Sequence, residues 1–111
     1  MRILLVENHQ LFAETVRREF LASHDVAVAP SLDLARVLLS RQTYDVVLVD
    51  FDLDDGKGTD LVVELRAAGF RGRVIAVSSH QRGNDLLLKA GADACCPKMK
   101  FAEISKFLES Q

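Results

Sequence analysis

Five short apolar runs alternate with five helical patterns, and this alternation constrains the fold more than any other feature of the chain. The runs are Ile3–Val6, Val26–Ala29, Val46–Val49, Val74–Val77 and Ala94–Cys96. Apolar residues at helical spacing lie in Leu11–Leu21, Leu32–Leu39, Leu61–Leu65, Leu86–Ala90 and Phe101–Leu108. Strands that alternate with helices form a parallel sheet whose two faces are both covered by helices. The sequence therefore predicts an α/β fold with five parallel strands.

The composition of the strands predicts their order in the sheet. The first, third and fourth runs are rich in valine, leucine and isoleucine, as expected of central strands buried on both faces. The second run ends at Pro30, and the fifth is bounded by Asp93 and Pro97. Proline and charge are typical of edge strands. We therefore expect the doubly wound, flavodoxin-like order 2-1-3-4-5, in which ligands bind beyond the carboxyl ends of strands one and three.

Length and composition exclude several classes of protein. The 111 residues suit one domain over residues 1–111, and 49 % hydrophobic residues can cover both faces of a small sheet. A net charge of −2 gives no basic field for direct binding of nucleic acid or of a membrane surface. The apolar runs are too short to span a bilayer, and no signal-peptide pattern follows Met1. The neighbours Cys95 and Cys96 suit neither a metal site nor an unstrained disulfide, which indicates a reducing, cytoplasmic location.

Polar side chains follow four of the five predicted strands. Glu7 and Asn8 follow the first strand, Asp50 the third and Ser78 the fourth, while Lys98 lies just after the fifth. Because the carboxyl ends of parallel strands meet at one edge of a sheet, we expect these side chains to converge. A carboxylate nucleophile, a hydroxyl, an ammonium and further oxygen ligands are the groups that phosphoryl transfer requires.

Four segments of the chain carry a resemblance to a known family. They are ILLVENHQLF at 3–12, VVLVDFDLDDGKGTDL at 46–61, VIAVSSH at 74–80 and GADACCPKMKFAEI at 91–104. In this order and spacing they resemble the receiver domain of two-component response regulators, over the whole length of the chain. Lys98 between Pro97 and Met99 resembles the branch whose receivers are fused to LuxR/NarL-type helix-turn-helix domains. The family has the strand order given above, so the resemblance and the composition are not independent evidence for it.

The resemblance implies a role for each of the converging residues. Asp50 would accept a phosphoryl group from a histidine kinase or a phosphotransfer protein, and Ser78 and Lys98 would contact that group. The only chemistry would be phosphorylation and dephosphorylation of Asp50 itself, without turnover of a separate substrate. An output domain outside this chain, or a second copy of it, would receive the signal. A Mg²⁺ ion would be held by Glu7, Asn8, Asp50 and the backbone carbonyl of Asp52.

Two departures from the family pattern leave alternatives open. Asn8 replaces a carboxylate at the metal position and lacks its charge, so we expect weak binding of Mg²⁺. Cys95 replaces the aromatic residue that commonly couples the site to the output face. Both favour a degenerate receiver that acts as a binding module without phosphorylation.

A third hypothesis is a haloacid-dehalogenase-type phosphatase, because Asp50-Phe51-Asp52 after an apolar strand matches its nucleophile motif. No acidic pair follows Lys98 to carry the metal of such an enzyme. The further acids Asp54, Asp55 and Asp60 are expected to form a solvated acidic loop.

Overall fold

A computed structural model of the chain describes residues 1–109. Its helices and strands are, in chain order, β1 (Arg2–Val6), α1 (Gln10–Glu19), β2 (Asp25–Ala29), α2 (Leu32–Arg41), β3 (Val46–Val49), β4 (Asp52–Leu53), β5 (Gly56–Lys57), α3 (Gly58–Ala67), β6 (Arg73–Ala76), α4 (Gln81–Ala90), β7 (Ala94–Cys95), the 3-10 helix η1 (Lys98–Glu103) and α5 (Ser105–Leu108). The order of helices and strands follows the predicted alternation.

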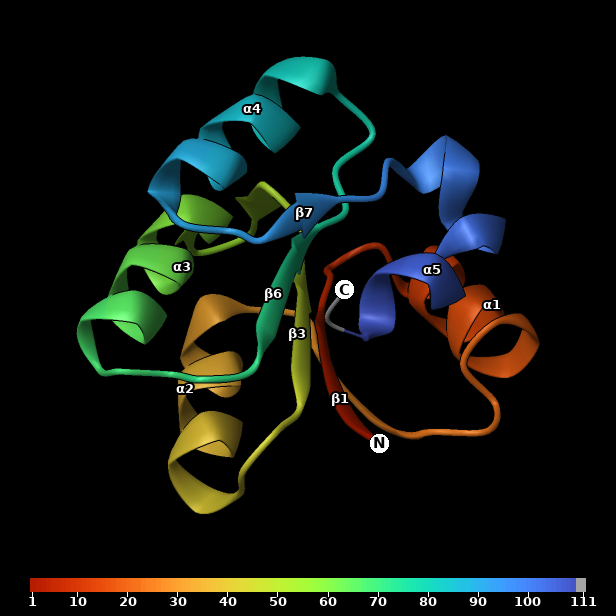
Figure 1. Cartoon of the computed structure of the whole chain (residues 1–111), viewed down its shortest axis with the longest axis horizontal. Coiled ribbons are helices and arrows are strands. Elements are labelled where there is room, and N and C mark those ends of the chain that lie inside the picture. Colours follow the sequence, from red (N-terminus) through yellow and green to blue (C-terminus); the bar gives the residue numbers. More distant parts are fainter. Residues whose placement is uncertain (110–111) are drawn as a thin grey trace.

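The main sheet has five parallel strands in the order β2-β1-β3-β6-β7. These are the five predicted strands, so the predicted order 2-1-3-4-5 is confirmed. Figure 1 shows α2, α3 and α4 on one side of the sheet and α1 and α5 on the other. Within residues 1–109, none of the helices is long and apolar enough to cross a membrane.

Alternate residues of the central strands point into two separate cores. In β1, Leu4 packs in the core under α2, α3 and α4, whereas Leu5 packs in the core under α1 and α5. Both side chains are fully buried, and the same alternation continues in β3 and β6. A strand buried on both faces has no polar position, which explains why these runs are apolar throughout.

Three parts of the fold differ from the sequence-based expectations. β4 and β5 form a small antiparallel pair outside the main sheet, and two residues are too short for any periodicity. α4 begins at Gln81, five residues before the predicted start, because its first turns bury Gly83 and Asn84 in place of apolar side chains. The last helical pattern divides into η1 and the short α5.

The start of α2 corrects the expectation for Asp55. Ser31 caps this helix as an acceptor for Leu34 N–H, at 3.1 Å. The Asp55 carboxylate also accepts hydrogen bonds from the backbone N–H groups of Leu32 and Asp33, at 2.8 and 3.0 Å. These hydrogen bonds lower the pKa of Asp55. Asp55 therefore caps a helix and is not a freely solvated acid.

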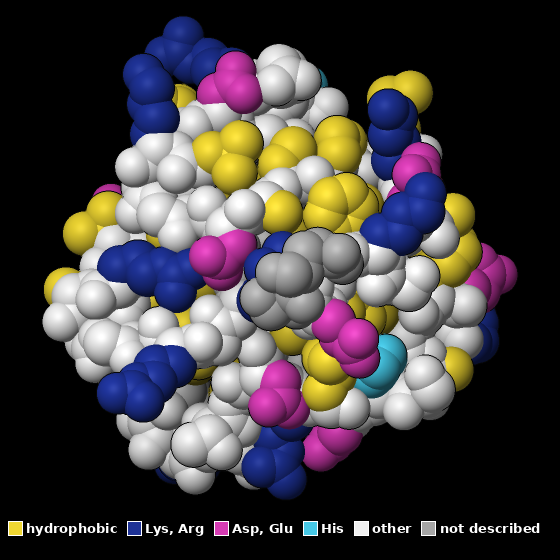
Figure 2. All heavy atoms as spheres, in the orientation of Figure 1, with side chains coloured by type: hydrophobic (Ala, Val, Ile, Leu, Met, Phe, Trp, Pro, Cys, Tyr) yellow, Lys and Arg dark blue, Asp and Glu magenta, His cyan; other side chains and the backbone are white. Residues whose placement is uncertain are grey.

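The edge strand β7 ends at Cys95, and Cys96 directly follows it. Cys96 is fully buried and Cys95 is half-buried, and both thiols are free. Burial raises the pKa of Cys96 to about 11, so this thiol is protonated at neutral pH. Figure 2, in the orientation of Figure 1, shows apolar side chains exposed on the viewed face of the molecule, together with lysine and arginine side chains.

Candidate functional site

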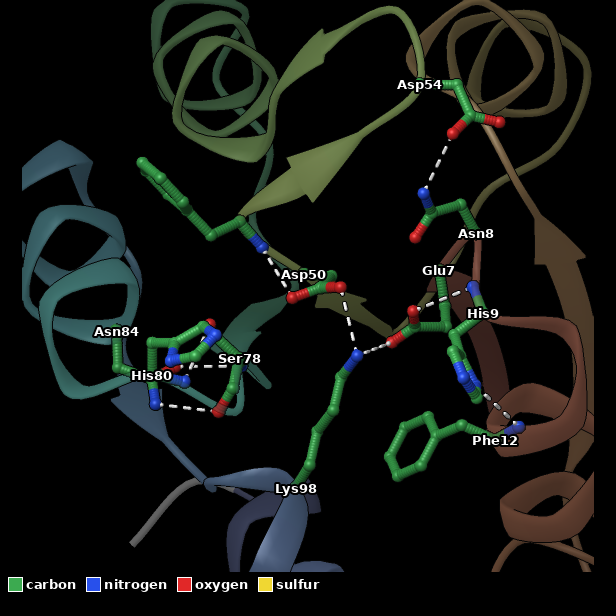
Figure 3. A network of polar contacts seen from close by, with 11 residues as sticks. Glu7, Asn8, His9, Phe12, Asp50, Asp54, Ser78, His80, Asn84 and Lys98 are labelled. Carbon is green, nitrogen blue, oxygen red and sulfur yellow. Dashed lines mark hydrogen bonds and ion pairs between the residues drawn. The ribbon is translucent and has the colours of Figure 1, made fainter.

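The carboxyl ends of the central strands bring the predicted residues together. Glu7 directly follows β1 and Asp50 directly follows β3, and the backbone pairing of the sheet continues into both residues. Asp50 N–H donates to the carbonyl of Val6, and Glu7 N–H donates to the carbonyl of Ala29. Lys98 begins η1, after the edge strand β7, and its side chain extends to a point between Asp50 and Glu7 (Figure 3).

Lys98 lies between two buried carboxylates. Its Nζ is 2.9 Å from Glu7 Oε1 and 3.0 Å from Asp50 Oδ2. The Glu7 side chain is fully buried, and that of Asp50 is 9 % exposed. Burial raises the pKa of Glu7, although the contact with Lys98 opposes this. Burial alone would lower the pKa of Lys98, but the two carboxylates outweigh it and the net shift is upward. The ammonium therefore stays charged beside both acids.

Hydrogen bonds satisfy some carboxylate oxygens of the site and leave one without an aligned partner. Asp50 Oδ1 accepts from Phe51 N–H at 2.8 Å, and Glu7 Oε2 accepts from His9 N–H at 3.0 Å. Glu7 Oε1 is buried and accepts no hydrogen bond of good geometry, despite its ion pair with Lys98. Glu7 shares Lys98 with Asp50, so the cluster holds two buried carboxylates and one ammonium.

The other two predicted metal ligands are Asn8, which follows Glu7, and Asp52, which begins β4. The Asp52 side chain pairs with Lys57, so the predicted role of Asp52 at a metal depends on its backbone carbonyl. Asn8 is exposed, and its Nδ2 donates to Asp54 Oδ1 at 2.9 Å. The contact between Asn8 and Asp54 spans 46 positions in the chain, and the sequence did not predict it.

Ser78 lies beyond the end of β6, in a hydrogen-bond network of its own. Its N–H donates to Asn84 Oδ1 at 2.9 Å, and Asn84 Nδ2 donates to the carbonyl of Ser78 at 3.0 Å. Within residues 1–109, the Ser78 hydroxyl accepts a hydrogen bond from His80 N–H and does not bond to Asp50. Asn84 is buried and clamps the backbone at Ser78. Sequence reasoning missed this role, because Asn84 lies outside the apolar pattern of α4.

Gly58, Gly83 and the ring of Phe12 also lie next to the site. A Cβ atom on Gly58 would lie 1.9 Å from the carbonyl oxygen of Asp50, and one on Gly83 would lie 2.8 Å from Ser78 Oγ. Only glycine lets the starts of α3 and α4 approach the site so closely. The ring of Phe12 lies 4.9 Å from Lys98 Nζ, which adds a cation–π contact to the ammonium.

The donor set fits a hard cation. Glu7, Asn8, Asp50 and the Asp52 carbonyl offer oxygen atoms, which are the ligands of Mg²⁺ in proteins. Within the described part of the chain, no three His, Cys, Asp or Glu side chains converge as metal ligands. Glu7 and Asp50 would therefore be the two carboxylates at the cation, with the amide oxygen of Asn8 and the carbonyl of Asp52 beside them.

A sequence model described as the response regulator receiver domain matches residues 3–109. The chain belongs to the response-regulator receiver family. The receiver is 34 % identical over 111 residues to the transcriptional regulatory protein CutR of Streptomyces coelicolor, covering 94 % of this chain and 50 % of CutR. This chain thus spans half the length of that relative.

Solved receiver structures have the same fold. The receiver domain of the sensor histidine kinase PA1611 from Pseudomonas aeruginosa is 26 % identical, with a TM-score of 0.86 and coverage of 96 % of this chain and 93 % of that one. That structure has a magnesium ion coordinated in its active-site cleft. A LuxR-family response regulator from Aurantimonas is also 26 % identical, with a TM-score of 0.82 and coverage of 95 % and 79 %.

Membership of the receiver family confirms the predicted resemblance. The similarity to a LuxR-family response regulator is consistent with the predicted LuxR/NarL-type branch. The family match argues against the phosphatase hypothesis, because it covers residues 3–109 and is to the receiver domain of response regulators. In this receiver the ion-pair cluster of Glu7, Asp50 and Lys98 lies at the predicted switch point between β1 and β3.

Proposed function

We propose that Asp50 accepts a phosphoryl group from a histidine kinase or phosphotransfer protein, in a reaction that depends on Mg²⁺. The observation that supports this most is the position of Asp50 Oδ2. This oxygen lies beyond the end of a central strand, 3.0 Å from Lys98 Nζ, which also contacts the buried Glu7 Oε1 at 2.9 Å. A nucleophilic oxygen, a cation and a metal-ligand oxygen meet there.

Phe51, Asp50 and Lys98 have different roles in the proposed transfer. Phe51 N–H fixes one oxygen of Asp50 and leaves Oδ2 as the attacking atom. The bond from phosphorus to the donor breaks as the bond to Oδ2 forms, and the donor nitrogen of the kinase or phosphotransfer protein keeps the electron pair. Lys98 then pairs with the phosphoryl oxygens, as a compact charge on a flexible stem can do. Mg²⁺, when bound, neutralises charge on those oxygens.

Ser78 is the residue through which the receiver would register the phosphoryl group. Its hydroxyl hydrogen is not used in the bond from His80 N–H, where the oxygen is the acceptor. The hydroxyl can therefore donate to a phosphoryl oxygen, while Asn84 keeps the backbone of Ser78 fixed. The response would reach an output domain outside this chain or a second copy of it.

Intact-mass measurement with acetyl phosphate and Mg²⁺ tests the assignment. We expect the chain to gain one phosphoryl group and the Asp50→Asn variant to gain none. Asp25→Asn, which removes the same charge at the amino end of β2, is the matched control and should react like the wild type. Phosphate that persists in Asp50→Asn, or that maps to Asp52, would refute the assignment. A wild-type chain that gains nothing would favour the binding-module alternative.

Asn8 makes the affinity for Mg²⁺ low in this proposal, because a neutral amide replaces a carboxylate. Asn8→Asp should tighten Mg²⁺ binding by about tenfold. The same substitution should destabilise the metal-free fold, since the new carboxylate would face Asp54 across the present 2.9 Å hydrogen bond. Magnesium titration and thermal melting of both proteins measure the two effects.

We also propose that residues 1–111 form one receiver domain that works in the cytoplasm and is not an enzyme acting on other molecules. The family match over residues 3–109 supports the single domain. Direct binding of nucleic acid or membrane is not part of the proposal, in keeping with the net charge of −2.

A further inference from the structure

We propose that Asp54 is a positioning residue for the metal site, which holds the Asn8 side chain with its amide oxygen toward Asp50 and Glu7. The inference rests on the proposed function, because it concerns the Mg²⁺ that phosphorylation of Asp50 would use. It goes beyond that function by giving a role to an acid in the β4–β5 turn.

The contact itself fixes the orientation of the amide. Asn8 Nδ2 lies 2.9 Å from Asp54 Oδ1. A carboxylate only accepts hydrogen bonds, so the amide nitrogen must face Asp54 and the amide oxygen must face the other way. Figure 3 shows the Asn8 oxygen on the side of Asp50 and Glu7, away from Asp54.

This orientation matters because an asparagine at a metal position is asymmetric. An aspartate presents an oxygen to the cation in either rotamer of its carboxylate. An asparagine presents either an oxygen, which binds a cation, or an NH₂ group, which repels it. A free Asn8 would have to give up the wrong orientation on binding. Asp54 removes the wrong orientation in advance, and such preorganisation of a ligand favours binding.

A second observation places the ligand on the same side. Glu7 is fully buried and shares its ion-pair partner Lys98 with Asp50, so two buried carboxylates face one ammonium and a cation would neutralise the remaining negative charge. Glu7 is the chain neighbour of Asn8, and Lys98 already contacts Glu7 Oε1 from one side. The oxygens of Glu7, Asp50 and the oriented Asn8 thus face one region.

The expected effect is modest because the Asn8–Asp54 pair is solvent-exposed. Water competes for both partners, and an exposed hydrogen bond changes an equilibrium by less than a buried one. We expect Asp54→Ala to weaken Mg²⁺ binding by about fivefold. Asp54→Asn should weaken it less, because the amide oxygen of the introduced side chain can still accept the hydrogen bond from Asn8.

The experiment is calorimetric titration of the unphosphorylated chain with Mg²⁺ alone. The variants are Asp54→Ala, Asp54→Asn and the control Asp25→Asn, each checked for folding by thermal melting. Asp54→Ala is also placed in the Asn8→Asp background. With an aspartate at position 8 there is no amide to orient, so the additional loss from Asp54→Ala should fall below about twofold, and the two substitutions should be coupled.

Each outcome is decisive. Asp54→Ala with wild-type affinity would overturn the positioning role while leaving phosphorylation of Asp50 untouched. A loss of equal size in Asp54→Asn and Asp54→Ala, or in both backgrounds, would assign the effect to charge and would also overturn it. A wild-type chain that binds no Mg²⁺ would overturn this role together with the metal dependence of the proposed function.

Discussion

The two ends of the sheet hold partly buried charges in opposite ways. At the amino end, Arg66 of α3 donates to the carbonyls of Gly91 and Phe70 at 2.9 and 3.2 Å, and to Asp93 at 2.7 Å. Asp93 also accepts from Val74 N–H at the start of β6. The charges at this end are therefore paired within the chain, and they join α3 to the segments before β6 and β7.

At the carboxyl end, Lys98 lies between the carboxylates of Glu7 and Asp50, and Glu7 Oε1 has no aligned hydrogen bond. The two ends differ in their charge balance. At the amino end one guanidinium pairs with one carboxylate, whereas at the carboxyl end two buried carboxylates share one ammonium. An excess of buried negative charge costs stability, and in the function proposed above a bound cation would neutralise it.

The largest predicted effect is on stability and concerns the ion pairs of Lys98 at the carboxyl end of the sheet. Lys98→Ala should lower the free energy of unfolding at pH 7 by about 3 kcal/mol, because it leaves two buried carboxylates without a cation. The Lys98 side chain is only 18 % exposed, so it does not behave as a solvated surface charge. Urea unfolding measures the effect. Lys106→Ala, which breaks an exposed pair with Glu103, is the control and should cost far less.

A second substitution checks the cause in the same protein. Adding Glu7→Gln to Lys98→Ala should recover part of the lost stability, since the neutral amide carries no charge to desolvate. If the double variant were less stable than Lys98→Ala alone, the buried charges would not explain the loss.

The next effect concerns Arg66 at the amino end of the sheet. Arg66→Met should lower the free energy of unfolding by about 2 kcal/mol, because it removes hydrogen bonds to two carbonyls and to Asp93. It should leave the amount of phosphate gained from acetyl phosphate unchanged, as measured by intact mass at a temperature where the variant is folded. A variant that is stable but fails to react would mean that the amino end also serves the site.

The smallest effect concerns Asp55, which lies near the carboxyl end of the sheet but caps the start of α2. Asp55→Asn should lower the melting temperature at neutral pH by a few degrees, because it weakens the cap on α2. The fold lowers the pKa of Asp55, so its contribution is present above the ordinary value of 3.8 and disappears as the pH falls through the lowered value. The difference in melting temperature between the two proteins should therefore be larger at pH 7 than at pH 2.

The fold was predictable where it depends on periodicity. Runs such as Val46–Val49 are apolar at every position because both faces are covered, and Pro30 and Pro97 mark the edge strands. The pair β4–β5 and the early start of α4 were not predictable. Two-residue strands have no period, and the first turns of α4 bury Gly83 and Asn84, which a hydrophobic pattern does not detect.

The site was predictable where residues directly follow strands. Glu7 and Asp50 extend β1 and β3, so the strand order alone places them together. The contacts of Asn8 with Asp54 and of Ser78 with Asn84 depend on loop and helix geometry. Neither composition nor spacing encodes that geometry. The sequence therefore indicated the acids and the lysine, but not the side chains that orient them.

The order of the strands has a consequence for the chain during its synthesis. Glu7 and Asp50 directly follow two strands that pair with each other, and both residues leave the ribosome with the first half of the chain. Lys98 follows much later, after the last strand. A nascent chain that has folded β1, β2 and β3 therefore holds two adjacent carboxylates with no ammonium between them. In the proposed function, such a chain would carry the acceptor oxygen without its counter-charge, and the ammonium would reach it only once the edge strand β7 had joined the sheet.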